Sequence, residues 1–334
     1  MRIATYNVEW FNTLFDDDGA LIDDDSWSSR WDVTKAQQIA GLGAVFQAMD
    51  ADAVMIIEAP DTSRNRSTVR ALDTFAARFG LRANTPLIGF ANDTQQEIAL
   101  LYDPALMTAK HDPQASANAP RFDEVIGMDV DIDASPDAIR WSKPPLEVAV
   151  TVGETSMRLI GVHAKSKAPH GARDEAEATR IAIQNRRKQL AQCIWLRKRV
   201  VQHLEAGEDL IVMGDFNDGP GLDEYEKLFG RSGVEIVLGE GQDAQLYDPH
   251  AQMALARRIG AMPTTARFKR KGQPYLQALL DYIMVSPNLR AQNPRWEIWH
   301  PFDHPTCYAD PGLRAALLAA SDHFPVVLDI DLSR

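Results

Sequence analysis

Six short apolar segments in this chain each end at, or lie directly beside, a residue that can bind a metal ion or move a proton. Runs rich in Val, Ile and Leu are typical of buried β-strands. The polar residues at their ends are Asn7, Glu58, His163, Asp215 with Asn217, Asp281, and Asp322 with His323. Side chains of these types that converge on one rim of a sheet are the usual arrangement in a metal-assisted hydrolase. We therefore expect one site that is assembled from distant parts of the chain.

Strand and helix patterns are mixed along the chain without strict alternation. The strand-like segments lie near residues 2–6, 53–57, 97–102, 145–151, 157–162, 209–213, 279–285 and 325–331. Longer amphipathic segments lie at 33–49, 65–79 and 173–205, and the last is the clearest helix, with Gly207 as a stop signal. Such a mixture favours an α/β protein whose sheets are partly antiparallel.

The bulk composition is that of an ordinary globular protein. The 334 residues are 45% hydrophobic and 25% charged, which provides enough apolar material for a core. Length alone allows two domains, although large sheet proteins of this length often form one. No apolar run is long enough for a membrane span, and Cys193 and Cys307 do not indicate a disulfide framework. We expect a cytoplasmic location if Met1 is the native start, and a secreted or periplasmic one if a signal peptide was trimmed.

The net charge of −12 argues against a polyanionic partner, because contacts from Lys and Arg to phosphate dominate the affinity for nucleic acid. Two features weaken that objection. A bound cation would offset the acidic groups of a metal site, and the basic residues are clustered at 186–188, 197–199 and 267–271. The first two clusters are typical of a solvated helix face. The third cluster lies in a loop-like stretch before Asp281. Its basic residues either contact phosphate or are simply exposed to solvent, and the sequence leaves both interpretations open.

The order of the polar strand ends resembles that of a known enzyme family. The matching strings are Asn7-Val8-Glu9, Glu58, His163, Gly214-Asp215-Phe216-Asn217, Leu280-Asp281-Tyr282-Ile283 and Ser321-Asp322-His323-Phe324-Pro325. Together they resemble the endonuclease/exonuclease/phosphatase superfamily, which includes deoxyribonuclease I, abasic-site endonucleases, neutral sphingomyelinases and inositol polyphosphate 5-phosphatases. The resemblance implies a single domain over residues 1–334. It also implies a four-layer α/β/β/α sandwich, in which two facing mixed sheets carry helices on their outer faces.

The resemblance further implies a set of metal ligands. Carboxylate and amide oxygens suit Mg²⁺ or Mn²⁺, and the implied contacts are Asn7, Glu9, Glu58 and Asp322, with Glu58 as the principal ligand. Alternation along a strand places residues 7 and 9 on one face, which allows both to reach the cation. A surface role for Glu9 stays open.

By the same resemblance, five residues act on the phosphoryl group. His163 and Asn217 donate hydrogen bonds to its oxygens. Asp281 orients His323, which accepts a proton from water or holds the water in place. Two roles are open for Asp215: it orients the nucleophile or protonates the leaving oxygen.

The segment after His163 indicates which branch of the family the chain resembles. The string His163-Ala164-Lys165-Ser166-Lys167 and the helix pattern that follows it resemble bacterial metal-dependent nucleases with a His-x-Lys-Ser-Lys motif. Abasic-site endonucleases instead carry a tyrosine at this place. Lys165 is thus a candidate phosphate contact, together with Arg267 and Lys269 from the third basic cluster. Glu97 is either a carboxylate partner of His163 or a plain strand-start residue.

The leading functional hypothesis is a divalent-metal-dependent phosphodiesterase, a nuclease whose expected substrate is nucleic acid, with DNA favoured over RNA. The alternative keeps the catalytic groups but acts on a phospholipid or a small phosphorylated molecule, which the acidic surface favours. A third hypothesis, a binding module without activity, is disfavoured because every catalytic position is filled.

Overall fold

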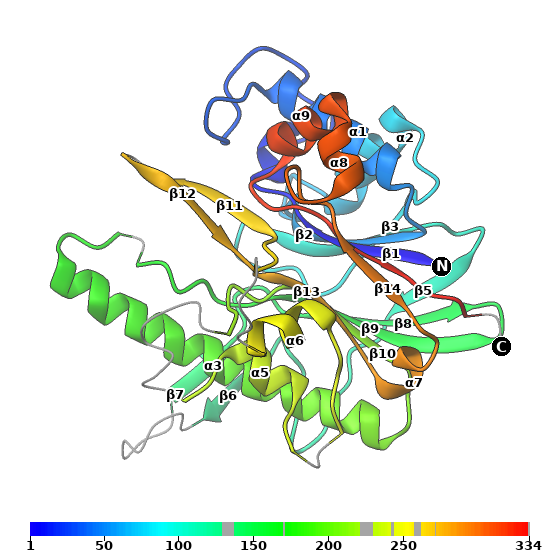
Figure 1. Cartoon of the computed structure of the whole chain (residues 1–334), viewed down its shortest axis with the longest axis vertical. Helices are drawn as coiled ribbons and strands as arrows, with labels where there is room; N and C mark the ends of the chain where they lie inside the picture. The colour runs from blue at the N-terminus through cyan, green and yellow to red at the C-terminus, as the bar shows by residue number, and fades with distance from the viewer. Residues whose placement is uncertain are drawn as a thin grey trace.

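In the computed structural model, which describes residues 1–128, 137–169, 171–220, 230–241, 244–256, 262–270 and 272–332, two β-sheets face each other (Figure 1). The first sheet has the strand order β14 (Arg295–Ile298), β15 (Val326–Asp329), β1 (Arg2–Asn7), β2 (Ala53–Ala59), β4 (Glu97–Tyr102), β3 (Thr85–Ile88). The second has the order β13 (Asp281–Val285), β10 (Leu210–Asp215), β9 (Thr155–His163), β8 (Leu146–Val152), β5 (Met107–His111). β1 runs parallel to β2 and β9 runs parallel to β10, and the other neighbours in these two sheets are antiparallel.

Helices cover the outer face of each sheet. Those on the first sheet are η1 (Phe11–Leu14), α1 (Lys35–Met49), α2 (Thr68–Phe79), α8 (Pro305–Ala309) and α9 (Pro311–Ala320). Those on the second are α3 (Glu175–Glu205), α5 (Gly233–Leu238) and α6 (Pro249–Leu255), and α7 (Pro287–Arg290) follows β13. None of the helices in the described ranges is both long and apolar enough to cross a membrane.

The two main helices begin where the sequence places helix-capping residues. The Thr34 side chain accepts the Gln37 N–H while the Gln37 side chain accepts the Thr34 N–H, which is a complete capping box at the start of α1. Asp174 caps α3 by accepting the Glu177 N–H. The expected helices at 33–49 and 173–205 are therefore confirmed, with their starts fixed by side-chain hydrogen bonds.

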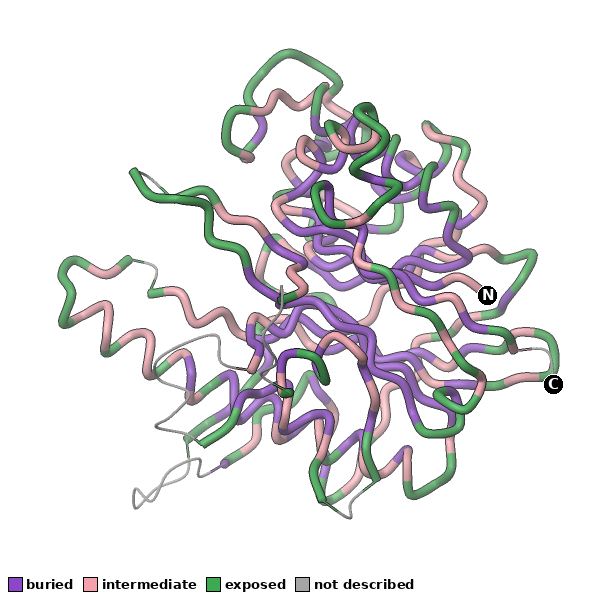
Figure 2. Tube along the Cα trace, in the orientation of Figure 1, coloured by how far each residue is buried: buried purple, intermediate pink, exposed green. Residues whose placement is uncertain are grey.

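Alternation along the strands divides the core into three apolar layers. In β1, Ala4 and Tyr6 pack against the outer helices, whereas Ile3 points between the sheets. In β9, Ile160 and Val162 pack against α3 and its neighbours, while Leu159 points toward the first sheet. Figure 2 shows the strands as largely purple, with the exposed residues on the outer turns of the helices and in the loops. The expected four-layer α/β/β/α sandwich is confirmed.

The strands that the sequence patterns miss are mostly short edge strands and exposed hairpins. They are β3, β5, β14, the hairpin of β6 (Val125–Met128) with β7 (Asp137–Arg140), and the hairpin of β11 (Ala266–Arg270) with β12 (Gln273–Ala278). The prediction of a loop at the third basic cluster is wrong, because residues 267–270 belong to β11. Lys271 lies outside the described residues. Most of β12 is exposed, so it carries no buried apolar run that would mark it as a strand.

The packing between the sheets leaves no room for a side chain at one position of β9. A Cβ atom on Gly161 would lie 2.4 Å from Met55 Sδ and 2.9 Å from Ile98 Cγ2, both on the facing sheet. These separations are shorter than any normal contact. Glycine at position 161 therefore lets the two sheets approach at the level of the polar rim.

We expect Gly161→Ala to lower the free energy of unfolding by about 1–3 kcal/mol, the usual effect of overpacking a core. The measurement is urea denaturation of the variant and the parent. Thr151→Ala, on the exposed face of β8, is the control and should stay within about 0.5 kcal/mol of the parent. Equal urea midpoints for Gly161→Ala and the parent would contradict the prediction, because they would show that the two sheets can accommodate the added methyl group.

Candidate active site

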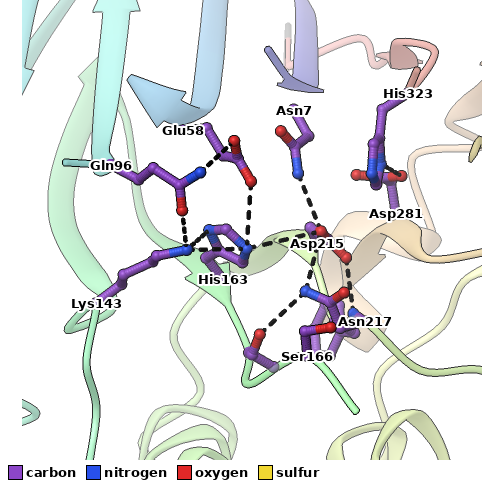
Figure 3. Close-up of polar contacts among 12 residues, drawn as sticks. Asn7, Glu58, Gln96, Lys143, His163, Ser166, Asp215, Asn217, Asp281 and His323 are labelled. Atoms are coloured by element: carbon purple, nitrogen blue, oxygen red, sulfur yellow. Dashed lines mark hydrogen bonds and ion pairs between the residues drawn. The ribbon is translucent and has the colours of Figure 1, made fainter. Parts of the chain in front are cut away.

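The predicted site residues meet at one rim of the sandwich. The carboxyl ends of β1, β2, β9 and β10 lie there, and β13 starts there because it runs antiparallel to β10, with Asp281 opposite Asp215. A cavity of about 850 Å³ opens at this rim. The predicted residues that line it are Asn7, Glu9, Glu58, His163, Lys165, Asp215, Asn217, Asp322 and His323. Figure 3 shows most of these side chains pointing toward one another from the two sheets.

Asp215 lies at the centre of this arrangement and links the two sheets. Its Oδ2 accepts hydrogen bonds from Asn7 Nδ2 at 3.0 Å and from Asn217 Nδ2 at 3.2 Å, and its Oδ1 accepts the Asn217 N–H at 2.7 Å. Burial, followed by the negative charge of Asp281, raises the pKa of Asp215 to about 7. Asp215 can therefore exist in both protonation states near neutral pH.

Asp281 and His323 form a buried acid–imidazole pair. His323 Nδ1 lies 2.7 Å from Asp281 Oδ2, and the His323 N–H donates to Ser321 Oγ. The Ser321 hydroxyl in turn donates to the carbonyl of Asn7, which ties the histidine segment to the end of β1. Burial lowers the pKa of His323, but the charge and hydrogen bond of Asp281 outweigh it, so the net pKa lies well above the usual value. The pair fixes the imidazole through Nδ1, and its Nε2 lies 4.0 Å from Asp322 Oδ1.

A second polar group surrounds His163. The Lys143 ammonium group donates to Gln96 Oε1 and lies 3.2 Å from His163 Nδ1, while Gln96 Nε2 donates to Glu58 Oε2 at 2.5 Å. Glu58 Oε1 is 3.9 Å from His163 Nε2. Burial, and then the positive charge of Lys143, holds the pKa of His163 well below its usual value, so its ring is neutral at neutral pH. A neutral imidazole beside an ammonium group can present one N–H to a phosphoryl oxygen.

Lys143 and Gln96 were not among the predicted site residues. Lys143 precedes β8 and Gln96 precedes β4, so both lie where an antiparallel strand begins at the rim. The sequence signal used above, a polar residue after an apolar run, cannot find them. Of the two interpretations of Glu97, the strand-start role is supported. Its carboxylate accepts hydrogen bonds from Asn92, and the adjacent Gln96 faces the site instead.

Backbone strain is concentrated around the cavity. Trp10, Glu58 and Asn217 line it, and each has a positive φ, of 56°, 63° and 50°. Non-glycine residues rarely adopt this region, and such residues gather at functional sites, where the surrounding structure holds them. At Glu58 the strain coincides with an irregularity in the pairing of β2 with β4, which turns the carboxylate toward the rim.

The remaining predicted residues lie at the border of the cavity or beyond it. Glu9 Oε2 is 2.5 Å from Arg30, and Asp322 Oδ1 is 4.0 Å from His323 Nε2. Lys165 lines the cavity, whereas Arg267 and Lys269 line a neighbouring cavity of about 800 Å³. The two cavities share Glu9 and Asp322, together with Phe268, as walls. The three predicted phosphate contacts are thus divided between two adjacent spaces.

The residues at the rim fit a hard divalent cation. Within the part of the chain that the structure describes, Asn7 Oδ1 and Asp281 Oδ1 are buried without a hydrogen-bond partner, although such oxygens are costly to bury unpaired. Asp215, Asp281 and His323 offer ligand atoms within 4.8 Å of one another. This cluster differs from the predicted ligand set, since its members were expected to be catalytic. His323 Nδ1 is already bonded to Asp281, so the atoms of the rim that suit Mg²⁺ or Mn²⁺ are oxygens: those of Asn7 and Glu58, with Asp215 and Asp281 beside them.

Comparison with known proteins identifies the family of this chain. The model of the Endonuclease/Exonuclease/phosphatase family matches residues 4–323. The chain belongs to this family. None of the curated proteins is detectably similar to it in sequence. Its membership makes it a hydrolase of the phosphodiesterase and phosphatase type, and confirms the resemblance at the level of the family.

Solved structures share the fold at low sequence identity. Truncated TDP2 from Caenorhabditis elegans has a TM-score of 0.53 at 12% identity, over 98% of this chain and 96% of that chain. TDP2 from D. rerio, complexed with a single-strand DNA product, has a TM-score of 0.50 at 12% identity, over 98% and 97%. A mannosyl-6-phosphatase from Bacteroides thetaiotaomicron has a TM-score of 0.51 at 14% identity, over 99% and 100%. At these identities the likeness establishes the fold.

The raised pKa of His323 predicts how this residue affects stability as the pH changes. Its folded pKa lies above the unfolded value, so its contribution is fully present below the unfolded pKa of about 6.5 and is lost as the pH rises through the folded pKa. In EDTA, the destabilisation caused by His323→Gln should therefore be larger at about pH 6 than at about pH 9, by at most about 1.4 kcal/mol per pH unit. Urea denaturation at the two pH values measures it.

His250→Gln is the matched control for this measurement. Burial lowers the pKa of His250 to about 4, so its contribution is lost as the pH falls below 6.5, in the opposite direction. A destabilisation by His323→Gln that is independent of pH would contradict the raised pKa of His323.

Proposed function

We propose that this protein is a divalent-metal-dependent phosphodiesterase that hydrolyses nucleic acid, with DNA as the favoured substrate. The observation that carries the proposal is the buried Asp281–His323 pair, which faces Asp215 and the unpaired oxygen of Asn7 across one cavity. A base, a second ionisable group and oxygen ligands within one cavity are the groups that metal-assisted hydrolysis of a phosphodiester needs.

Asn7 and Glu58, which line the cavity, would hold the cation, next to the Asp215–Asp281–His323 cluster that Asn7 contacts through Asp215. When bound, Mg²⁺ or Mn²⁺ would polarise the phosphoryl group and offset its negative charge. We keep Glu9 and Asp322, which line the same cavity, among the proposed metal contacts, although Glu9 is also paired with Arg30.

The protein's own groups would then position the phosphodiester and move its protons. In its neutral form His323 takes the proton of the attacking water, with Asp281 holding the ring, and in its protonated form it holds an anionic oxygen. Asp215, whose pKa is about 7, can protonate the leaving oxygen or orient the water. His163, Asn217 and the Lys143 ammonium group are placed to donate hydrogen bonds to phosphoryl oxygens.

The preference for nucleic acid rests on the surroundings of the rim. Lys165 of the His-x-Lys-Ser-Lys string lines the catalytic cavity, which agrees with the resemblance to bacterial nucleases. Lys167 of the same string instead forms an ion pair with Asp218 at 2.6 Å. Arg267 and Lys269 add positive charge beside the cavity, despite the net charge of −12. A structural neighbour, D. rerio TDP2, was solved with a single-strand DNA product.

A small phosphorylated molecule is the second candidate substrate. The acidic net charge favours it, and one structural neighbour is a mannosyl-6-phosphatase. The same rim would serve a phosphomonoester, because the groups that contact the phosphoryl oxygens do not depend on the size of the leaving group.

Incubation of the purified protein with Mg²⁺ or Mn²⁺ and a panel of substrates tests the proposal. We expect cleavage of DNA and of bis-p-nitrophenyl phosphate, and loss of both activities in EDTA. The panel also contains RNA, p-nitrophenyl phosphate and mannose 6-phosphate. Hydrolysis of monoesters alone would favour the second candidate, no hydrolysis of any substrate would favour a binding module, and full activity in excess chelator would refute the metal requirement.

Asp281 and His323 should act as one unit in this reaction. We expect His323→Ala and Asp281→Ala each to lower kcat for bis-p-nitrophenyl phosphate by roughly 10²–10⁴, the range of general acid–base catalysis. The double variant should lose far less than the product of the two losses, since either change already disables the pair. Multiplicative losses would show that the two side chains act independently.

A further inference from the structure

A second cavity adjoins the catalytic one and differs from it in chemistry. It measures about 800 Å³ and shares Glu9, Phe268 and Asp322 with the catalytic cavity. Its other walls combine cationic side chains from β11 with the aromatic rings of Trp31 and Tyr275. The proposed reaction at the rim does not use these rings.

The β11–β12 hairpin that forms one wall is anchored directly to the catalytic segments. The Arg267 N–H donates to the carbonyl of Asp322 at 2.7 Å, and the Phe324 N–H donates to the carbonyl of Thr265 at 2.7 Å. The Thr265 hydroxyl oxygen also accepts the Asp281 N–H at 3.0 Å. From this base the hairpin projects away from the sandwich (Figure 1), and Figure 2 shows its outer part exposed. Its side chains are therefore held at a fixed position relative to the reaction centre.

The opposite wall presents a large exposed ring on a well-ordered turn. Trp31 is 70% exposed, yet its neighbours are fixed: Arg30 bonds Glu9 and the carbonyl of Leu318, and the Ser28 N–H donates to the carbonyl of Val33. These hydrogen bonds hold the exposed indole at a defined place beside the cavity, where its ring is open to a ligand.

Cations lie against the aromatic rings of this cavity. Lys269 Nζ is 4.4 Å from the centre of the Trp31 ring, and the Arg267 guanidinium carbon is 3.5 Å from the centre of the Tyr275 ring. An aromatic ring next to a cationic group is suited to binding a nucleotide, because the base can stack on the ring and the phosphate can form an ion pair with the cation.

We propose that this cavity is a subsite for an unpaired nucleotide that flanks the scissile phosphate, with its base on Trp31 and its phosphate at Lys269 and Arg267. The inference rests on the proposed function and deepens it. It assigns the protein a single-stranded or frayed substrate, because a base within a duplex has no free face to offer an aromatic ring.

Binding in EDTA separates base stacking from attraction to phosphate. Three fluorescent ligands are compared by anisotropy: a short single strand of DNA, a strand of equal length made of abasic sites, and the duplex. We expect the parent to bind the single strand most tightly. Trp31→Ala should weaken that binding about 5- to 100-fold, the range for stacking of one base on a ring, and should not change binding of the abasic strand.

Trp27→Ala is the matched control. Trp27 lies in the same loop and is 68% exposed, but it lines neither cavity, so its loss should leave all three affinities and the hydrolysis of bis-p-nitrophenyl phosphate unchanged. Arg267→Gln and Lys269→Gln provide a second measurement that does not depend on Trp31. Each should reduce the slope of log K against log salt by about 0.7 for the single strand.

Three results would overturn the subsite. They are parental binding of the single strand by Trp31→Ala, equal binding of the abasic and normal strands by the parent, and unchanged salt slopes in the two cation variants. Impaired hydrolysis of mannose 6-phosphate by Trp31→Ala with unchanged DNA binding would instead assign the cavity to a sugar. Hydrolysis of bis-p-nitrophenyl phosphate by the parent tests the proposed reaction separately. If the parent hydrolyses it and one of these three results is found, the proposed reaction stands and only the subsite is refuted.

Discussion

The hydrogen bond from Asn7 to Asp215 joins the two halves of the sandwich at the point where their chemistry meets. Asn7 ends β1 of the first sheet and Asp215 ends β10 of the second, and both side chains are buried. Neither sheet alone contains the site. The bond forms only when the apolar layer between the sheets is packed closely enough, and a glycine at position 161 allows this close approach. Stability and function therefore share one structural requirement, the distance between two facing sheets.

Burial at the rim explains why its groups differ so much from one another in acidity. Asp215 and Glu58 are carboxylates with raised pKa values because burial penalises their charge, whereas His163 and His323 shift in opposite directions. The difference between the two histidines follows from their partners: His163 lies beside the Lys143 ammonium group, and His323 lies beside the Asp281 carboxylate. Two identical side chains thus provide a neutral donor and a basic group within one cavity.

Much of this site could be predicted from the sequence because buried strands carry a clear apolar pattern. Asn7 and Asp215 follow such runs, and Asp281 opens one, so their convergence followed from the strand ends. Lys143 and Gln96 could not be found in that way, since they lie in loops ahead of β8 and β4 and no local pattern indicates which loop side chain turns inward. The four-layer arrangement itself came from the family resemblance, since strand patterns do not specify how two sheets pair. The β11–β12 hairpin was missed because most of its residues face water. Its sequence therefore lacks the apolar run that marks a buried strand.

The division of labour between the rim and its surroundings accounts for how this fold can serve different substrates. The rim is built at the ends of buried strands, where a shift of one residue would turn the wrong side chains inward, so its geometry is tightly constrained. The walls beyond it come from a loop and from the outer, exposed part of a hairpin, whose side chains are less constrained by the core than those of the rim. Neighbours of this fold include a protein solved with a DNA product and a sugar phosphatase, at 12% and 14% identity. In this chain the exposed Trp31 lies on the loop wall and the cations of β11 lie on the hairpin wall. Hydrogen bonds of Thr265 and Arg267 hold the hairpin beside His323. If the proposed function and subsite hold, the strand ends provide the reacting groups and the two exposed segments beside them contact the rest of the substrate.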